Sequence, residues 1–90
     1  MPLRDHALNT SQALLAEAAG NHRQATDLFA RAAMRWEAFG STLEQAYALL
    51  GQARCLGALG DPAADAPLRQ ARAMFAEMGS QTRVEECDTP

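Results

Sequence analysis

The stretch ATDLFARAAMRWEAFGS, residues 25–41, returns in altered form 39 residues later as ADAPLRQARAMFAEMGS, residues 64–80. Apolar residues in both stretches recur every three or four positions, which is the spacing of one face of an α-helix. The corresponding positions are Ala25, Phe29, Ala32, Trp36, Gly40 and Ser41 in the first stretch and Ala64, Leu68, Ala71, Phe75, Gly79 and Ser80 in the second. The chain is therefore predicted to contain one helix twice, each copy followed by a Gly-Ser pair.

The segments that precede these two helices also correspond, with a shift of 40 residues. Gln12, Ala13, Ala18 and Gly20 correspond to Gln52, Ala53, Ala58 and Gly60. The repeating unit is therefore a pair of helices, and a period of this length is typical of arrays in which each unit packs on the next. We place unit one at about 3–39, unit two at about 42–78 and a truncated third unit at 80–87.

A glycine followed by a residue that can begin a helix recurs at roughly every twentieth position. Glycine accepts the left-handed conformation that ends many helices, and Asn, Ser or Asp can cap the helix that follows. The pairs are Gly20-Asn21, Gly40-Ser41, Gly60-Asp61 and Gly79-Ser80, and they predict helices over 3–19, 22–39, 42–59 and 62–78, with a stub over 81–87. Ser41 and Glu44 fit a capping box, and Asp61 fits a cap before a proline. Loops this short make consecutive helices antiparallel neighbours.

The composition favours a single all-α domain over residues 1–90. Alanine, the best helix former, makes up about a fifth of the chain, which has one valine and no isoleucine. The net charge of -3 does not favour a nucleic-acid ligand, and all basic residues are arginine, which suggests a bacterial genome rich in G and C. No apolar run could cross a membrane and no signal peptide is evident. We therefore expect a cytoplasmic protein in which Cys55 and Cys87 are free thiols.

The spacings Ala25-x3-Phe29-x2-Ala32 and Ala64-x3-Leu68-x2-Ala71 resemble the second helix of a tetratricopeptide repeat. The resemblance covers about residues 6–80 and is closest to the longer-period repeats of large bacterial regulatory ATPases and transcription activators. It implies a short right-handed stack of antiparallel hairpins, with four helices and the C-terminal stub. The residues expected to pack the repeats together are Ala25, Phe29, Ala32, Trp36, Ala64, Leu68, Ala71 and Phe75.

The same resemblance implies a groove lined by the first helix of each unit. The register of the family places Thr10, Ser11, Leu14 and Glu17 on this groove in unit one, and Tyr47, Leu50, Gly51 and Arg54 in unit two. The residues expected to contact a protein or peptide partner are Thr10, Ser11, Glu17, Tyr47 and Arg54, whereas Leu14 and Leu50 are alternatively core residues. Since Arg54 is the only cation in the set, a site that clamps a carboxylate is not expected.

Aromatic and methionine residues at helical spacing are expected to lie mostly in the core between the hairpins. They are Met34, Trp36, Phe39, Met74, Phe75 and Met78. A stack of two units also leaves an open face at each end, because repeat arrays usually need polar capping helices. We therefore expect self-association through these end faces, for example as a homodimer, or through exchange of the stub helix.

No residue pattern indicates a catalytic or metal site. The residues His6, His22, Cys55 and Cys87 lack the spacing of zinc ligands, and the isolated glycines form no phosphate-binding loop. We expect no enzyme activity, metal or cofactor, and a function as a scaffold-like module for protein-protein interaction. One alternative is a sensor or relay fragment of a larger bacterial transcriptional regulator. Another is a helical domain that binds nucleic acid, which the dispersed arginines disfavour.

Overall fold

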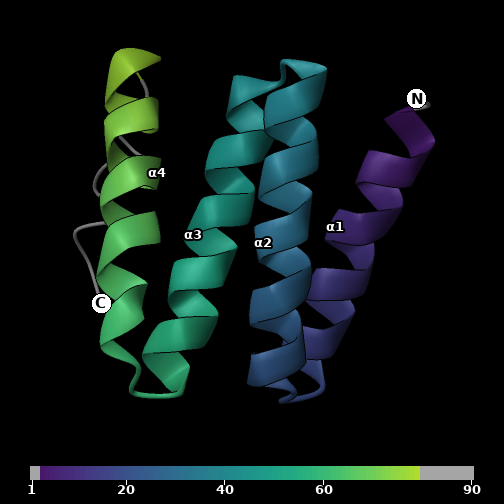
Figure 1. Cartoon of the computed structure of the whole chain (residues 1–90), viewed down its shortest axis with the longest axis vertical. Helices are drawn as coiled ribbons and strands as arrows, with labels where there is room; N and C mark the ends of the chain where they lie inside the picture. Colours follow the sequence, from purple (N-terminus) through teal and green to yellow (C-terminus); the bar gives the residue numbers. More distant parts are fainter. Residues whose placement is uncertain (1–2, 80–90) are drawn as a thin grey trace.

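The computed structural model describes residues 3–79, with side chains from residue 10 onwards, and this part of the chain is all-α, with no strand. The helices are α1 (Leu3–Ala18), α2 (His22–Phe39), α3 (Thr42–Ala58) and α4 (Asp65–Glu77), and a short 3-10 helix, η1 (Pro62–Ala64), precedes α4. Figure 1 shows the four α-helices in a row in chain order, each antiparallel to the next. The predicted all-α fold of four helices is confirmed, while the truncated third unit at 80–87 lies outside the described residues.

The helices end where the glycine pairs predict. The backbone angle φ is +83°, +92°, +69° and +73° at Gly20, Gly40, Gly60 and Gly79. These values lie in the left-handed region, which a residue with a Cβ rarely adopts. At the end of α2, the N–H of Gly40 donates to the carbonyl oxygens of Trp36 and Glu37, so the last turn keeps its hydrogen bonds.

Among the predicted caps within residues 3–79, only Asp61 forms a side-chain cap, and Ser80 lies outside the described residues. Oδ1 of Asp61 accepts a hydrogen bond from the N–H of Ala63 at 2.9 Å, whereas the side chains of Asn21 and Ser41 make no capping hydrogen bond. The capping box predicted for Ser41 and Glu44 is wrong. In such a box the glutamate accepts from the backbone N–H of the serine, but the N–H of Ser41 already donates to the carbonyl oxygen of Trp36 at 3.0 Å.

The fourth helix begins later than the spacing of the sequence predicts. Residues Pro62–Ala64 form a 3-10 turn, and the α-helix starts at Asp65. Pro67 explains the difference, because a proline deep in an α-helix lacks the N–H and its ring collides with the carbonyl four residues earlier. A start at Asp65 puts Pro67 in the first turn, where no intrahelical donor is needed.

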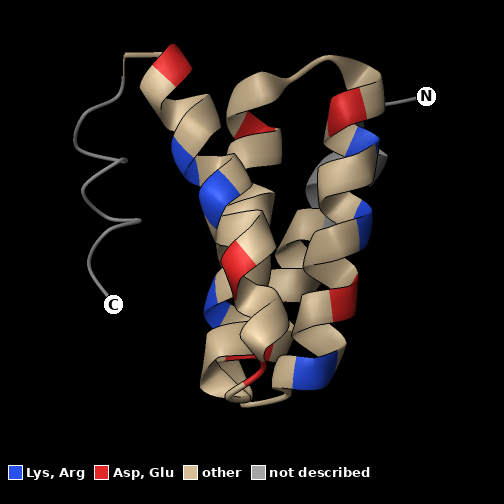
Figure 2. Ribbon diagram, turned by 60° about the vertical axis from the view of Figure 1, so that its left-hand side comes forward, with Lys and Arg blue, Asp and Glu red and all other residues tan. Residues whose placement is uncertain are grey.

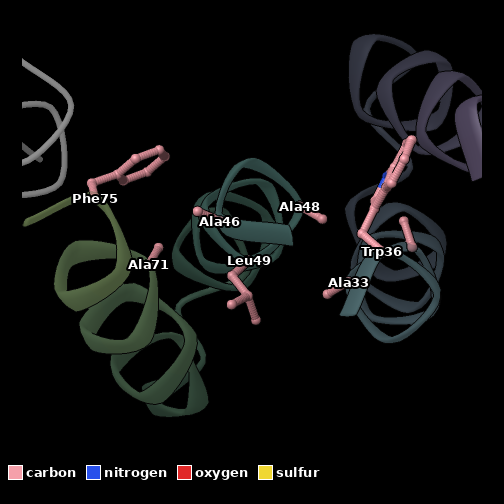
Figure 3. Packing of buried hydrophobic residues seen from close by; sticks show 8 residues of the cluster. Ala33, Trp36, Ala46, Ala48, Leu49, Ala71 and Phe75 are labelled. Carbon is pink, nitrogen blue, oxygen red and sulfur yellow. The ribbon is translucent and has the colours of Figure 1, made fainter. Parts of the chain in front are cut away.

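The core consists of two clusters of buried side chains that share α2 and α3. The larger cluster joins α2, α3 and α4 and contains Ala32, Ala33, Trp36, Ala46, Ala48, Leu49, Ala71 and Phe75. Figure 3 shows alanines of α2, α3 and α4 on the sides of the helices that face one another, which allows close approach. The smaller cluster joins α1, α2 and α3 and contains Ala13, Ala16, Ala25, Phe29 and Cys55.

Most of the residues predicted to pack the repeats are buried. Ala25, Phe29, Ala32, Trp36, Ala71 and Phe75 are all in the two clusters, and Leu68 is half-buried against the larger one. Ala64 is an exception, since it is half-buried in the 3-10 turn and belongs to neither cluster. The late start of α4 explains this difference.

The prediction that the aromatic and methionine residues lie mostly in the core is wrong for three of them. Met34, Phe39 and Met78 are exposed, and Met34 is 72% exposed. Met34 precedes Trp36 by two residues, about 200° around the helix, so it points away from the neighbours that cover Trp36. Phe39 is the last residue of α2, and Met78 directly follows the last residue of α4.

Within residues 3–79, none of the helices combines the length and the apolar character that a membrane span requires.

Candidate protein-interaction face

Two rows of side chains, one on α1 and one on α3, include most of the predicted groove residues. These helices are parallel to each other, because each is antiparallel to α2 (Figure 1). Side chains three or four residues apart lie on one side of a helix. The rows are Thr10, Leu14 and Glu17 on α1 and Leu43, Tyr47, Leu50 and Arg54 on α3, and we call these seven residues the open face.

The two rows meet at an ion pair between Glu17 and Arg54. Nη2 of Arg54 donates to Oε1 of Glu17 at 2.7 Å, and Nε donates to Oε2, so two hydrogen bonds join the groups. Bidentate pairs of this kind are stronger and more directional than single contacts. The hydrogen bonds from Arg54 lower the pKa of Glu17, and the same contact raises the pKa of Arg54. The only cation predicted in the groove is therefore neutralised within the chain.

Gly51, which the sequence places on the groove, is instead buried against the ring of Phe29 in α2. A Cβ at Gly51 would lie 2.6 Å from Cε1 and 2.7 Å from Cδ1 and Cζ of that ring, distances that real Cβ atoms essentially never show. The assignment of Gly51 to the groove is wrong, because it lies about 100° around α3 from Leu50, toward α2. The guanidinium carbon of Arg54 lies 5.9 Å from the centre of the same ring.

Thr10 and Tyr47, both predicted to contact a partner, connect helices within the chain. Oγ1 of Thr10 accepts a hydrogen bond from Nε1 of Trp36 at 3.0 Å, which joins α1 to α2. Figure 3 shows the ring of Trp36 directed from α2 toward α1. The ring of Tyr47 packs edge-to-face on Phe75, with the ring centres 5.3 Å apart, which joins α3 to α4. Both side chains are half-buried, so each supports the fold and also forms part of the open face.

The leucines supply the exposed apolar surface of the open face. Leu14 is 49% exposed, so the alternative that it belongs to the core is wrong. Leu50 is half-buried against the larger cluster and lies at the edge of the core. Sequence reasoning missed Leu43, which is 46% exposed, although its position four residues before Tyr47 would have identified it. Ser11 is exposed next to the row on α1, about 100° around the helix from Thr10.

Cys55 and His22 are the candidate metal ligands whose side chains the structure describes. Cys55 is fully buried in the smaller cluster, and this burial raises the pKa of its thiol to about 11, so the thiol is protonated at neutral pH. His22 is half-buried at the start of α2. The described side chains include no group of three or more His, Cys, Asp or Glu that could hold a metal ion. The side chains of His6 and Cys87 lie outside the described part of the chain.

Comparisons with models of protein families, with curated proteins and with solved structures found no significant match for this chain.

Proposed function

We propose that this chain is a non-catalytic module that binds a protein or peptide partner on the open face. The observation that carries the proposal is the exposure of Leu14 and Leu43 on two helices whose rows are joined by the Glu17–Arg54 pair. Exposed apolar residues that gather on one face are typical of interaction sites. Half-buried Tyr47, which belongs to the aromatic residues enriched at such interfaces, lies on the same face.

The chemistry of the open face favours a partner with apolar side chains over a charged one. The guanidinium of Arg54 already donates two hydrogen bonds to the carboxylate of Glu17, so a carboxylate of the partner would have to displace Glu17. The leucines need no such displacement, and covering them removes apolar surface from water. An amphipathic helix or an apolar peptide segment is therefore the proposed ligand class.

The resemblance to tetratricopeptide repeats supports this proposal through architecture alone, since fold does not determine function. Antiparallel hairpins that pack through alanines are expected for such repeats. A role as a sensor or relay in a larger bacterial regulator is compatible with the same face and remains an alternative. Nucleic-acid binding is disfavoured, because Figure 2 shows acidic and basic residues interspersed along the helices instead of a basic face.

The test combines Leu14→Glu and Leu43→Glu, which place charge on the open face at two exposed positions outside both buried clusters. Met34→Glu is the matched control, because Met34 is more exposed and lies on α2, outside the open face. Substitution of Tyr47 or Arg54 is less suitable, since both hold neighbouring helices together.

Partners captured from cell extract by the wild type are identified, purified and titrated against all three proteins by isothermal calorimetry. We expect at least a tenfold loss of affinity for the double variant, no change for Met34→Glu, and equal helical circular dichroism. Equal affinity for all three proteins would show that the open face does not bind the partner.

A further inference from the structure

Helix α1 is attached to the rest of the described structure through a small set of specific contacts. Its described buried residues are Ala13 and Ala16, which pack in the smaller cluster against α2 and α3. Two polar contacts add to this packing, from Trp36 to Thr10 and from Arg54 to Glu17. All of these contacts join α1 to α2 or α3, so an identical helix from another chain can make every one of them.

The turn between α1 and α2 can be straightened by a change at two adjacent residues, Gly20 and Asn21, whose backbone angles are not helical. Gly20 has φ of +83°, and a Cβ placed there would meet nothing within 4 Å. The side chain of Asn21 makes no capping hydrogen bond that would hold the turn closed. Ala18 and Ala19, which precede Gly20, have the highest helix propensity. Helical conformations at Gly20 and Asn21 would merge α1 and α2 into one continuous helix over 3–39.

The other turns are less suited to such an opening. In the turn before α4, Asp61 caps Ala63 and is followed by Pro62, which cannot continue a helix from α3. Opening the turn between α2 and α3 would separate both clusters, because each contains residues of both helices. Opening the turn at Gly20 leaves the larger cluster intact, since that cluster has no member on α1.

We propose that α1 exchanges between two copies of this chain, so that each copy of α1 docks on α2 and α3 of the other. Docking requires a hydroxyl at Thr10, small residues at Ala13 and Ala16 and a carboxylate at Glu17 that matches Arg54. A second copy supplies this combination at the correct spacing. The exchanged dimer keeps all the contacts of the monomer and differs only in the turn, which is the usual route of domain swapping. This proposal is independent of the proposed function.

The first test is Gly20→Ala. Alanine is disfavoured at φ of +83° and favoured in a continuous helix, so the substitution should destabilise the closed turn. Each α1–α2 connection that opens should raise the association constant of the dimer about tenfold. A dimer opens two such connections, so we expect an increase of about a hundredfold. Light scattering should detect a species of twice the 9.7 kDa chain mass.

Gly60→Ala is the matched control. Gly60 has a similar φ of +69° and the same open space around a Cβ, but Pro62 prevents helix continuation there. This variant should lose stability and stay at the oligomeric state of the wild type. A Gly20→Ala protein with the same mass as Gly60→Ala at all concentrations would overturn the proposal.

The second test identifies the contact within the dimer. In the Gly20→Ala background, one chain carries Glu17→Arg and another carries Arg54→Glu. Each chain alone brings like charges together, whereas α1 exchange between the two chains restores both ion pairs. After the chains are unfolded and refolded together, native mass spectrometry should show the heterodimer well above its statistical share of one half. A statistical mixture means that the dimer uses another surface, and it would overturn the exchange of α1.

Discussion

Substitution of Gly51 by alanine tests the packing of α3 on α2 at its tightest point. The added Cβ would lie 2.6 Å from the ring of Phe29, which is only 2% exposed. Overpacking of a core typically costs about 1–3 kcal/mol, whereas replacing glycine by alanine within a helix gains about 1 kcal/mol or less. We therefore expect a net loss of about 1–2 kcal/mol in the free energy of unfolding.

The measurement is urea unfolding followed by circular dichroism, supported by the melting temperature. For a domain of this size, a loss of 1 kcal/mol lowers Tm by about 4–8 °C. Gly57→Ala is the control on the same helix, because a Cβ at Gly57 meets nothing within 4 Å. That substitution should raise the free energy of unfolding by several tenths of a kcal/mol, which is the helix propensity effect alone.

A third variant separates overpacking from any other effect at this position. In a Phe29→Leu background the ring is absent, so Gly51→Ala should no longer be destabilising relative to its own parent. The reasoning is refuted if Gly51→Ala raises stability as much as Gly57→Ala does. That result would mean that the ring of Phe29 does not lie over Gly51.

Two further predictions concern an ion pair and a cap. Because Arg54 lowers the pKa of Glu17 below its ordinary value of 4.5, the stabilisation from Glu17 is fully present above about pH 4.5 and is lost as the pH falls through the folded-state pKa. Urea unfolding of the wild type and of Glu17→Gln between pH 3 and 6 should show this difference, and equal pH dependence of the two proteins would contradict it. Asp61→Ala should lower the free energy of unfolding by about 1 kcal/mol, since the cap on Ala63 is lost, whereas Ser41→Ala should cost only a few tenths because Ser41 makes no such bond. Thermal melts of both variants would measure this, and an equal loss would argue against the assigned caps.

The sequence predicted the elements of the fold well because the signals involved are local. Each helix end depends on a few neighbouring residues, and glycine is the residue for which a left-handed turn costs least. The groove residues came instead from the register that the resemblance to tetratricopeptide repeats implies, and this register included Gly51 and omitted Leu43. Errors arose where one residue had several local options, as at Ser41, whose N–H bonds to the preceding helix.

The contacts between helices could not be predicted in this way. Met34 and Trp36 are both large apolar residues of α2, yet one is exposed and the other buried, because only one of them faces α1 and α3. The pairing of Glu17 with Arg54 depends on the distance between α1 and α3, and no local sequence pattern predicts that distance.

The amino-acid sequence by itself determined that residues 3–79 form four antiparallel helices, because alanine content, helical spacing and glycine stops act within a few residues of one another. Only the tertiary structure decided which side of each helix is covered. It placed Gly51 beneath Phe29, tied Thr10 to Trp36 and left Leu14 and Leu43 exposed. The physical reason is that burial depends on the distance and orientation of neighbouring helices, which are set by all the side chains between them at once.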